Sequence, residues 1–262
     1  MPDITLNSAT LYYQRYGQSG QPTLLLSHSL FFDHSMFDPL VSLLSAHFDL
    51  LVYDHRGQGL SSRDGPLDMD QLAEDAAELI VALGLAPCYV AGNSMGGFVA
   101  LRLAARHPQL LAGCIVMGSS ADLEHNLAAF EPLVESLAVQ GTAAHIDALM
   151  YIMFGDRSLA DPEAAAMLAH WRSKMQGLGT GIAAAASAVI HRTSLIDELA
   201  DVSVPLLVLA GEQDHAYSVA LSEQIVHCAG HGELRVISGA GHSVALEAPQ
   251  QVADALIAFA KN

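Results

Sequence analysis

Short apolar segments alternate with helical segments along this chain, and this alternation restricts its fold more than any other feature. The runs Leu24–Leu26, Leu50–Tyr53 and Cys88–Ala91 are bounded by polar turns, as is typical of buried central strands. Asp70–Leu85 and Met95–Arg106 instead carry apolar residues at helical spacing. Strand and helix in repeated alternation predict an α/β fold, with a mostly parallel central sheet covered by helices on both faces.

The pattern changes between residues 122 and 198, where helical spacing dominates and strand signals disappear. Alternation then resumes with the ranges Leu206–Ala210, Ser218–Cys228, Leu234–Ile237 and Gln250–Lys261. We therefore expect a core formed by residues 1–121 and 199–262. Residues 122–198 are expected to form a helical cap, inserted within this single domain.

Composition excludes several classes of protein. The chain has 52% hydrophobic and 15% charged residues, so it can bury a large core. It has 11 Lys+Arg against 28 Asp+Glu, a formal net charge of −17, which disfavours nucleic acid and anionic membranes as partners. No signal peptide and no apolar run of membrane-spanning length is visible, so we expect a cytoplasmic protein. Its three cysteines form no CxxC pair, and we expect no metal.

The segment from Val90 to Gly97 contains the pattern G-x-S-x-G between an expected strand and an expected helix. A serine at such a turn has a strained backbone that lifts its hydroxyl above the edge of the sheet. Gly92 and Gly96 supply the small residues that let the strand and the helix approach each other. Ser94 is therefore the predicted nucleophile.

A serine hydroxyl needs an adjacent base, and that base needs an orienting acid. The order on this kind of scaffold is serine, acid, histidine. Asp214 follows one late strand and His242 lies in a glycine-rich loop after the next, which predicts them as acid and base. Glu212 and Asp122 remain alternative acids.

The oxyanion of an acyl-transfer intermediate needs backbone donors. Met95, the residue after the nucleophile, is expected to supply one N–H, and Leu30, in the loop after an early strand, the other. Apolar and polarisable residues are predicted to line the substrate pocket: His28, Phe31, Met150, Met153 and Trp171. Three cations of the cap are candidate carboxylate anchors: Arg172, Lys174 and Arg192.

Five blocks in this order resemble the α/β-hydrolase superfamily: LLLSHSL, LLVYDHRGQGLSS, VAGNSMGGFVALRLAARHP, VPLLVLAGEQD and VISGAGHSVALEAP. The first block is most similar to enol-lactonases that open 3-oxoadipate enol-lactone and to related esterases. The resemblance implies the α/β-hydrolase fold, hydrolysis of an ester or lactone through Ser94, His242 and Asp214, and no cofactor. GNSMGG also resembles the serine hydrolases that cleave the carbon–carbon bond of ring-fission diketones.

The chain departs from these patterns at three places. His28-Ser29 stands where the superfamily often has His-Gly, and Phe31-Phe32 where the lactonases tend to have glycine. Ser243 follows the histidine, where diketone hydrolases have an aromatic residue soon afterwards.

The sequence predicts a hydrolase of small, largely apolar esters or lactones. Formation of a homo-oligomer is compatible with this prediction. Carbon–carbon bond hydrolysis, cofactor-free perhydrolysis and a non-catalytic ligand receptor remain the alternatives.

Overall fold

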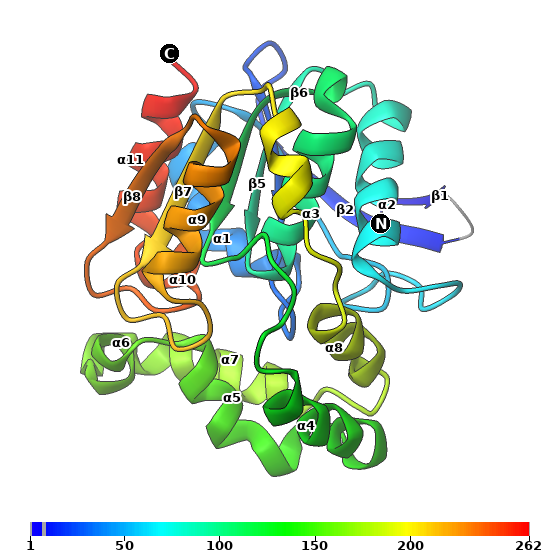
Figure 1. Ribbon diagram of the computed structural model, residues 1–262, viewed down its shortest axis with the longest axis vertical. Helices are drawn as coiled ribbons and strands as arrows, with labels where there is room; N and C mark the ends of the chain where they lie inside the picture. The colour runs from blue at the N-terminus through cyan, green and yellow to red at the C-terminus, as the bar shows by residue number, and fades with distance from the viewer. Residues whose placement is uncertain (1, 7–8, 262) are drawn as a thin grey trace.

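The computed structural model describes residues 2–6 and 9–261 and contains one eight-stranded sheet (Figure 1). Its strands lie in the order β1-β2-β4-β3-β5-β6-β7-β8. The first two pairings, β1 with β2 and β2 with β4, are antiparallel, and the others are parallel. The strands are β1 (Asp3–Leu6), β2 (Ala9–Gly17), β3 (Thr23–Ser27), β4 (Asp49–Tyr53), β5 (Cys88–Asn93), β6 (Leu111–Met117), β7 (Leu206–Gly211) and β8 (Glu233–Ile237).

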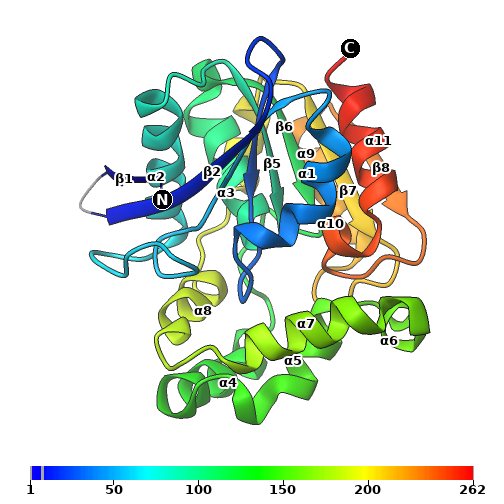
Figure 2. The same ribbon diagram turned by 180° about the vertical axis from the view of Figure 1, so that it is seen from behind.

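Helices cover both faces of the sheet (Figures 1 and 2). One face carries α2 (Met69–Ala82), α3 (Met95–Arg106) and α9 (Val219–Ala229), and the other carries α1 (Asp38–Leu44) and α11 (Pro249–Phe259). All residues of β4 and of β7 are buried, because a parallel sheet between two helical layers has no solvent-facing side. The predicted fold class is confirmed.

Five helices lie together across the end of the sheet to which the parallel strands point (Figure 1). They are α4 (Leu127–Gln140), α5 (Ile146–Met153), α6 (Asp156–Ala160), α7 (Ala165–Gln176) and α8 (Ile182–Ile190). We call α4–α8 the cap, and 122–198 stays our proposed extent for it. Because the loops after β3, β5, β7 and β8 emerge at this end, the cap covers the edge where site residues gather.

The remaining helical elements are short. They are α10 (Val244–Glu247) and the 3₁₀ turns η1 (His34–Phe37), η2 (Pro108–Leu110), η3 (Ala143–His145), η4 (Pro162–Ala164) and η5 (Ile196–Asp201). None of the helices in the described residues is long and apolar enough to cross a membrane.

Candidate active site

Ser94 lies in a sharp turn between β5 and α3, with φ 53° and ψ −112°. A left-handed φ is costly for a residue with a Cβ, so the surroundings must hold this conformation. The Ser94 amide donates to the carbonyl of Met117 at 2.8 Å, and Ser119 Oγ donates to the Ser94 carbonyl at 2.8 Å. Bonds on both sides of the residue therefore fix the turn.

Glycine is required on both sides of this serine because the strand and helix pass very close to each other. A Cβ on Gly92 would lie 2.0 Å from the carbonyl oxygen of Gly96. A Cβ on Gly96 would lie 2.0 Å from the carbonyl oxygen of Ser27 in β3. The turn predicted from G-x-S-x-G is thus present, with the steric reason that the sequence suggested.

Ser94, His242 and Asp214 form one hydrogen-bonded line although they are far apart in sequence. Ser94 Oγ lies 2.7 Å from His242 Nε2, and His242 Nδ1 lies 3.0 and 3.1 Å from the two carboxylate oxygens of Asp214. All three side chains are buried or nearly so. The geometry suits proton transfer from the hydroxyl to Nε2, with the carboxylate accepting from Nδ1–H.

Backbone amides hold the Asp214 carboxylate in place. Its Oδ1 accepts hydrogen bonds from the amides of Ala216 at 2.8 Å and Tyr217 at 2.9 Å. Glu212, the nearby alternative acid, instead accepts from Ser238 Oγ and the Gly239 amide at the surface. Asp122, the other alternative, contacts His125. Of the three acids, Asp214 is the one that meets His242.

Two amides that were expected to bind an oxyanion are left without an acceptor. Met95 is the first residue of α3, and a helix leaves its first N–H groups unpaired. Leu30 lies in the loop after β3, and neither its N–H nor that of Met95 donates to any described residue. Leu30 and Ser94 line the same pocket. Their role in an oxyanion hole remains a prediction with this support.

Gln58, which sequence analysis did not single out, bridges the two sides of this arrangement. Its Oε1 accepts the Phe31 amide at 3.1 Å, and its Nε2 lies 3.4 Å from Met95 Sδ. Phe31 has φ 70°, another left-handed residue with a Cβ. Gln58 therefore holds the strained turn that keeps the neighbouring Leu30 amide free.

The pocket above Ser94 contains two of the five predicted lining residues, Phe31 and Met153. His28, Met150 and Trp171 are not among the residues that line it, which corrects their expected placement. Trp171 packs against Phe32, with ring centroids 4.6 Å apart. His28, Met150 and Trp171 are all buried, but away from this pocket. Sequence reveals that such residues are buried and does not reveal which of them faces a cavity.

His28 makes structural contacts at the start of the loop after β3. Its Nε2 accepts the His55 amide at 3.0 Å, and its Nδ1–H donates to the Ser29 carbonyl at 2.8 Å. Burial lowers the pKa of His28, which favours the neutral imidazole that this pair of bonds needs. The imidazole ties the loop after β3 to the loop after β4.

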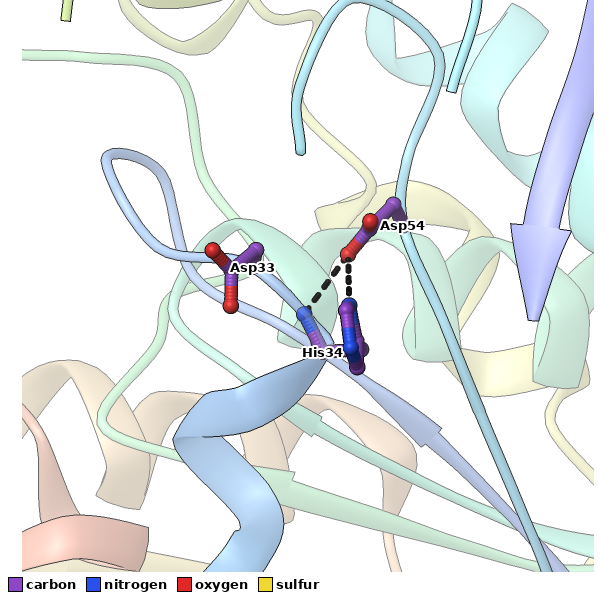
Figure 3. Close-up of side chains that lie close together, drawn as sticks. All are labelled: Asp33, His34 and Asp54. Carbon is purple, nitrogen blue, oxygen red and sulfur yellow. Dashed lines mark hydrogen bonds and ion pairs between the residues drawn. The ribbon is translucent and has the colours of Figure 1, made fainter. Parts of the chain in front are cut away.

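One group of acids and a histidine in the described residues has metal-ligand spacing: Asp33, His34 and Asp54 (Figure 3). Its atoms already bond within the protein. Asp54 Oδ1 accepts from His34 Nδ1 at 2.8 Å, and Asp33 pairs with Lys174 Nζ of α7 at 2.5 Å. These contacts join η1 to the core and to the cap.

Glu247 connects the loop of His242 to the cap. Its carboxylate accepts hydrogen bonds from the Ser243 amide at 3.1 Å, from the Gly155 amide at 2.8 Å and from Ser158 Oγ at 2.7 Å. Burial raises the pKa of Glu247, and these donors oppose that rise. Sequence reasoning missed this residue, although it stands five positions after His242 in the block GHSVALE.

Replacing Glu247 with alanine is expected to lower kcat for p-nitrophenyl acetate about 10- to 100-fold. The change leaves buried N–H groups beside His242 without an acceptor, so the imidazole loses its alignment with Ser94. Steady-state kinetics measures the effect. Glu223→Ala, at an exposed position of α9, is the matched control and should retain full activity. Equal kcat values for the two variants would contradict the positioning role of Glu247.

A sheet of this topology, with a serine elbow and a histidine and aspartate beyond later strands, is the arrangement of the α/β hydrolases. The chain belongs to the alpha/beta hydrolase family, whose sequence profile matches residues 24–255.

The curated proteins to which this chain is similar include an enol-lactonase and a protein named for carbamate hydrolysis. The chain is 28% identical to 3-oxoadipate enol-lactonase 2 of Acinetobacter baylyi over 261 residues, which cover 99% of this chain and 96% of that protein. It is 27% identical over 247 residues to RutD of Serratia proteamaculans, named for a proposed carbamate hydrolase activity, with 90% of each chain covered. Among solved structures, the enol-lactonase from Burkholderia xenovorans LB400 superposes with a TM-score of 0.93, at 27% identity and with both chains fully covered.

Proposed function

We propose that this protein is a serine hydrolase that cleaves carboxylic esters or lactones of small, largely apolar substrates. The observation that carries the proposal is the line from Ser94 Oγ through the His242 imidazole to Asp214, next to two unpaired amides. The relatives named for lactone opening act on the same class of bond, an acyl carbon bound to oxygen.

The proposed reaction has two acyl-transfer steps. His242 Nε2 takes the Ser94 proton as Oγ attacks the carbonyl carbon, and Asp214 stabilises the imidazolium that forms. The amides of Leu30 and Met95 bind the oxyanion of the tetrahedral intermediate. The imidazolium protonates the leaving oxygen, the carbon–oxygen bond breaks, and an ester to Ser94 remains. Water activated by His242 then releases the acid and frees Ser94.

Labelling with a fluorophosphonate, followed by peptide mapping, tests the nucleophile directly. We expect one adduct, on the peptide that contains Ser94, because only a hydroxyl with an adjacent base attacks phosphorus rapidly. Protein unfolded in urea before labelling is the control and should remain unlabelled. An adduct elsewhere, or none in the folded protein, would argue against the proposal.

A substrate panel separates the reaction types that share this triad. We expect turnover of simple p-nitrophenyl esters and small lactones. A carbamate tests carbamate hydrolysis, a ring-fission dienoate tests carbon–carbon bond hydrolysis, and an ester with added peroxide tests perhydrolysis. Preference for any of these over esters and lactones by kcat/KM would replace the proposed substrate class while leaving the nucleophile assignment intact.

A further inference from the structure

The pocket that contains Ser94 and His242 has an almost entirely apolar wall. Most of its lining comes from the cap: Phe130, Leu133, Leu149, Ile152, Val189 and Ile190. Among the described residues, three ionisable side chains line this pocket: His242, Glu124 and Tyr217. Burial raises the pKa of Tyr217 to about 12, so that phenol is neutral. Apart from His242, the described residues that line the pocket therefore carry one carboxylate and no cation.

The cap cations that were candidate carboxylate anchors are each already paired with an acid of the protein. Arg192 Nη1 lies 3.3 Å from Glu124 Oε2, Lys174 Nζ lies 2.5 Å from Asp33, and Arg172 Nη1 lies 2.7 Å from Asp147. None of these three cations lines the pocket around Ser94. A substrate carboxylate that entered it would meet apolar carbon and another carboxylate.

Arg192 is held behind the pocket wall by several further contacts. Its Nε donates to the Asp122 carbonyl at 2.8 Å, and its Nη1 donates to the Val189 carbonyl at 2.9 Å. Its guanidinium carbon lies 4.3 Å from the centre of the Phe98 ring, and its side chain is 2% exposed. Turning this cation toward a ligand would break all of these interactions. Arg192 therefore pairs with Glu124 from behind the pocket wall and is not available to a substrate.

A second cavity shares Phe31 with the first pocket, and the cations Arg63 and Lys174 are among the residues that line it. Neither Ser94 nor His242 lines it. The acyl portion of a substrate remains bound to Ser94 until the second step, whereas the alcohol of an open-chain ester leaves after the first. The apolar pocket beneath the cap, which contains Ser94, therefore suits the acyl portion, and the cations of the second cavity do not line that pocket.

We infer that the enzyme selects substrates by charge: its acyl pocket takes uncharged, apolar acyl groups, and Glu124 excludes those that carry a carboxylate. This inference rests on the proposed function and specifies its substrate class. It also separates the chain from its enol-lactonase relatives, since an enol-lactone of the dicarboxylic acid 3-oxoadipate retains one free carboxylate. Burying that carboxylate here would cost its hydration without a compensating cation.

Three p-nitrophenyl esters that share a six-carbon acyl chain test charge selection. They are the hexanoate, the adipate monoester, and the adipate monoester whose far carboxyl is methylated. We expect kcat/KM for the adipate monoester to be at least about 100-fold below that for the hexanoate. The methylated ester should fall within about tenfold of the hexanoate, because it has the greater length without the charge.

Glu124→Gln isolates the residue responsible. The substitution removes the negative charge and leaves Arg192 unpaired behind the wall, so the ratio of hexanoate to adipate monoester kcat/KM should fall at least about tenfold. Glu135→Gln, at an exposed position of helix α4, is the matched control and should leave the ratio unchanged.

The possible outcomes distinguish failure of this inference from failure of the proposed function on which it rests. If the hexanoate is hydrolysed and the adipate monoester reaches a similar kcat/KM, charge selection is wrong and the hydrolase assignment stands. An unchanged ratio in Glu124→Gln removes Glu124 from the explanation and overturns the inference as stated. Failure to hydrolyse the hexanoate, together with failure of fluorophosphonate labelling, would overturn both.

Discussion

Replacing Ser94 with alanine is expected to reduce kcat for p-nitrophenyl acetate by on the order of 10⁴-fold or more. The substitution removes the hydroxyl oxygen that lies 2.7 Å from His242 Nε2 and would form the ester with the substrate. The imidazole and the two free amides remain, so a small residual rate is expected from oxyanion binding alone. Stopped or continuous assay of p-nitrophenolate release measures the loss.

The control for Ser94→Ala is Ser42→Ala, which removes an exposed hydroxyl that donates to the Asp38 carbonyl in α1. That variant should retain the activity of the parent protein. The two variants should also unfold at similar temperatures, since alanine at position 94 keeps the same Cβ. A kcat for Ser94→Ala close to that of the parent protein would refute the nucleophile assignment.

The turn at Ser94 and the meeting of Ser94, His242 and Asp214 could be predicted because each residue lies in a short segment with a recognisable pattern. G-x-S-x-G requires only neighbouring residues, and the contact between Gly92 and Gly96 is set by the turn itself. Asp214 and His242 could be chosen because parallel strands deliver their carboxyl-end loops to one edge of the sheet. The fold class could be predicted because short, entirely apolar segments are typical of parallel strands buried between two layers of helices.

Other features were not predictable because they depend on which distant segments meet. Gln58 meets Phe31 only where the loops after β3 and β4 lie side by side, and Glu247 meets Gly155 only where the cap packs against the core. The strand β1 and the helix α1 were not anticipated either. β1 is a short edge strand with a mostly exposed or half-buried pattern, and α1 begins at the pair Asp38-Pro39 after a 3₁₀ turn. Neither has the long periodic pattern on which sequence reasoning relies.

The buried ion pair between Arg56 and Asp75 leads to the largest expected effect on stability. Arg56 Nε lies 2.8 Å from Asp75 Oδ2, and Nη2 lies 2.6 Å from Oδ1, with the two side chains 0% and 2% exposed. Replacing Asp75 with alanine leaves a guanidinium charge in the interior without its carboxylate. We expect the free energy of unfolding to fall by about 3–5 kcal/mol.

Urea unfolding measures this change as a lower midpoint at constant slope. Asp254→Ala, at an exposed position of α11 where the carboxylate accepts from Gln250, is the control and should stay within about 0.5 kcal/mol of the parent protein. A loss below about 1 kcal/mol for Asp75→Ala would show that the interior adapts to the isolated charge.

The same variant also tests how the fold supports the site. Arg56 stands two residues before Gln58, whose amide holds the strained turn at Phe31 and contacts Met95. Loss of the Asp75 carboxylate releases the loop after β4 from α2, so Gln58 should position the Leu30 amide less accurately. Protein that remains folded should therefore lose kcat while KM changes little, because an oxyanion donor acts mainly in the transition state. An equal loss of binding and turnover would instead place the effect in the pocket as a whole.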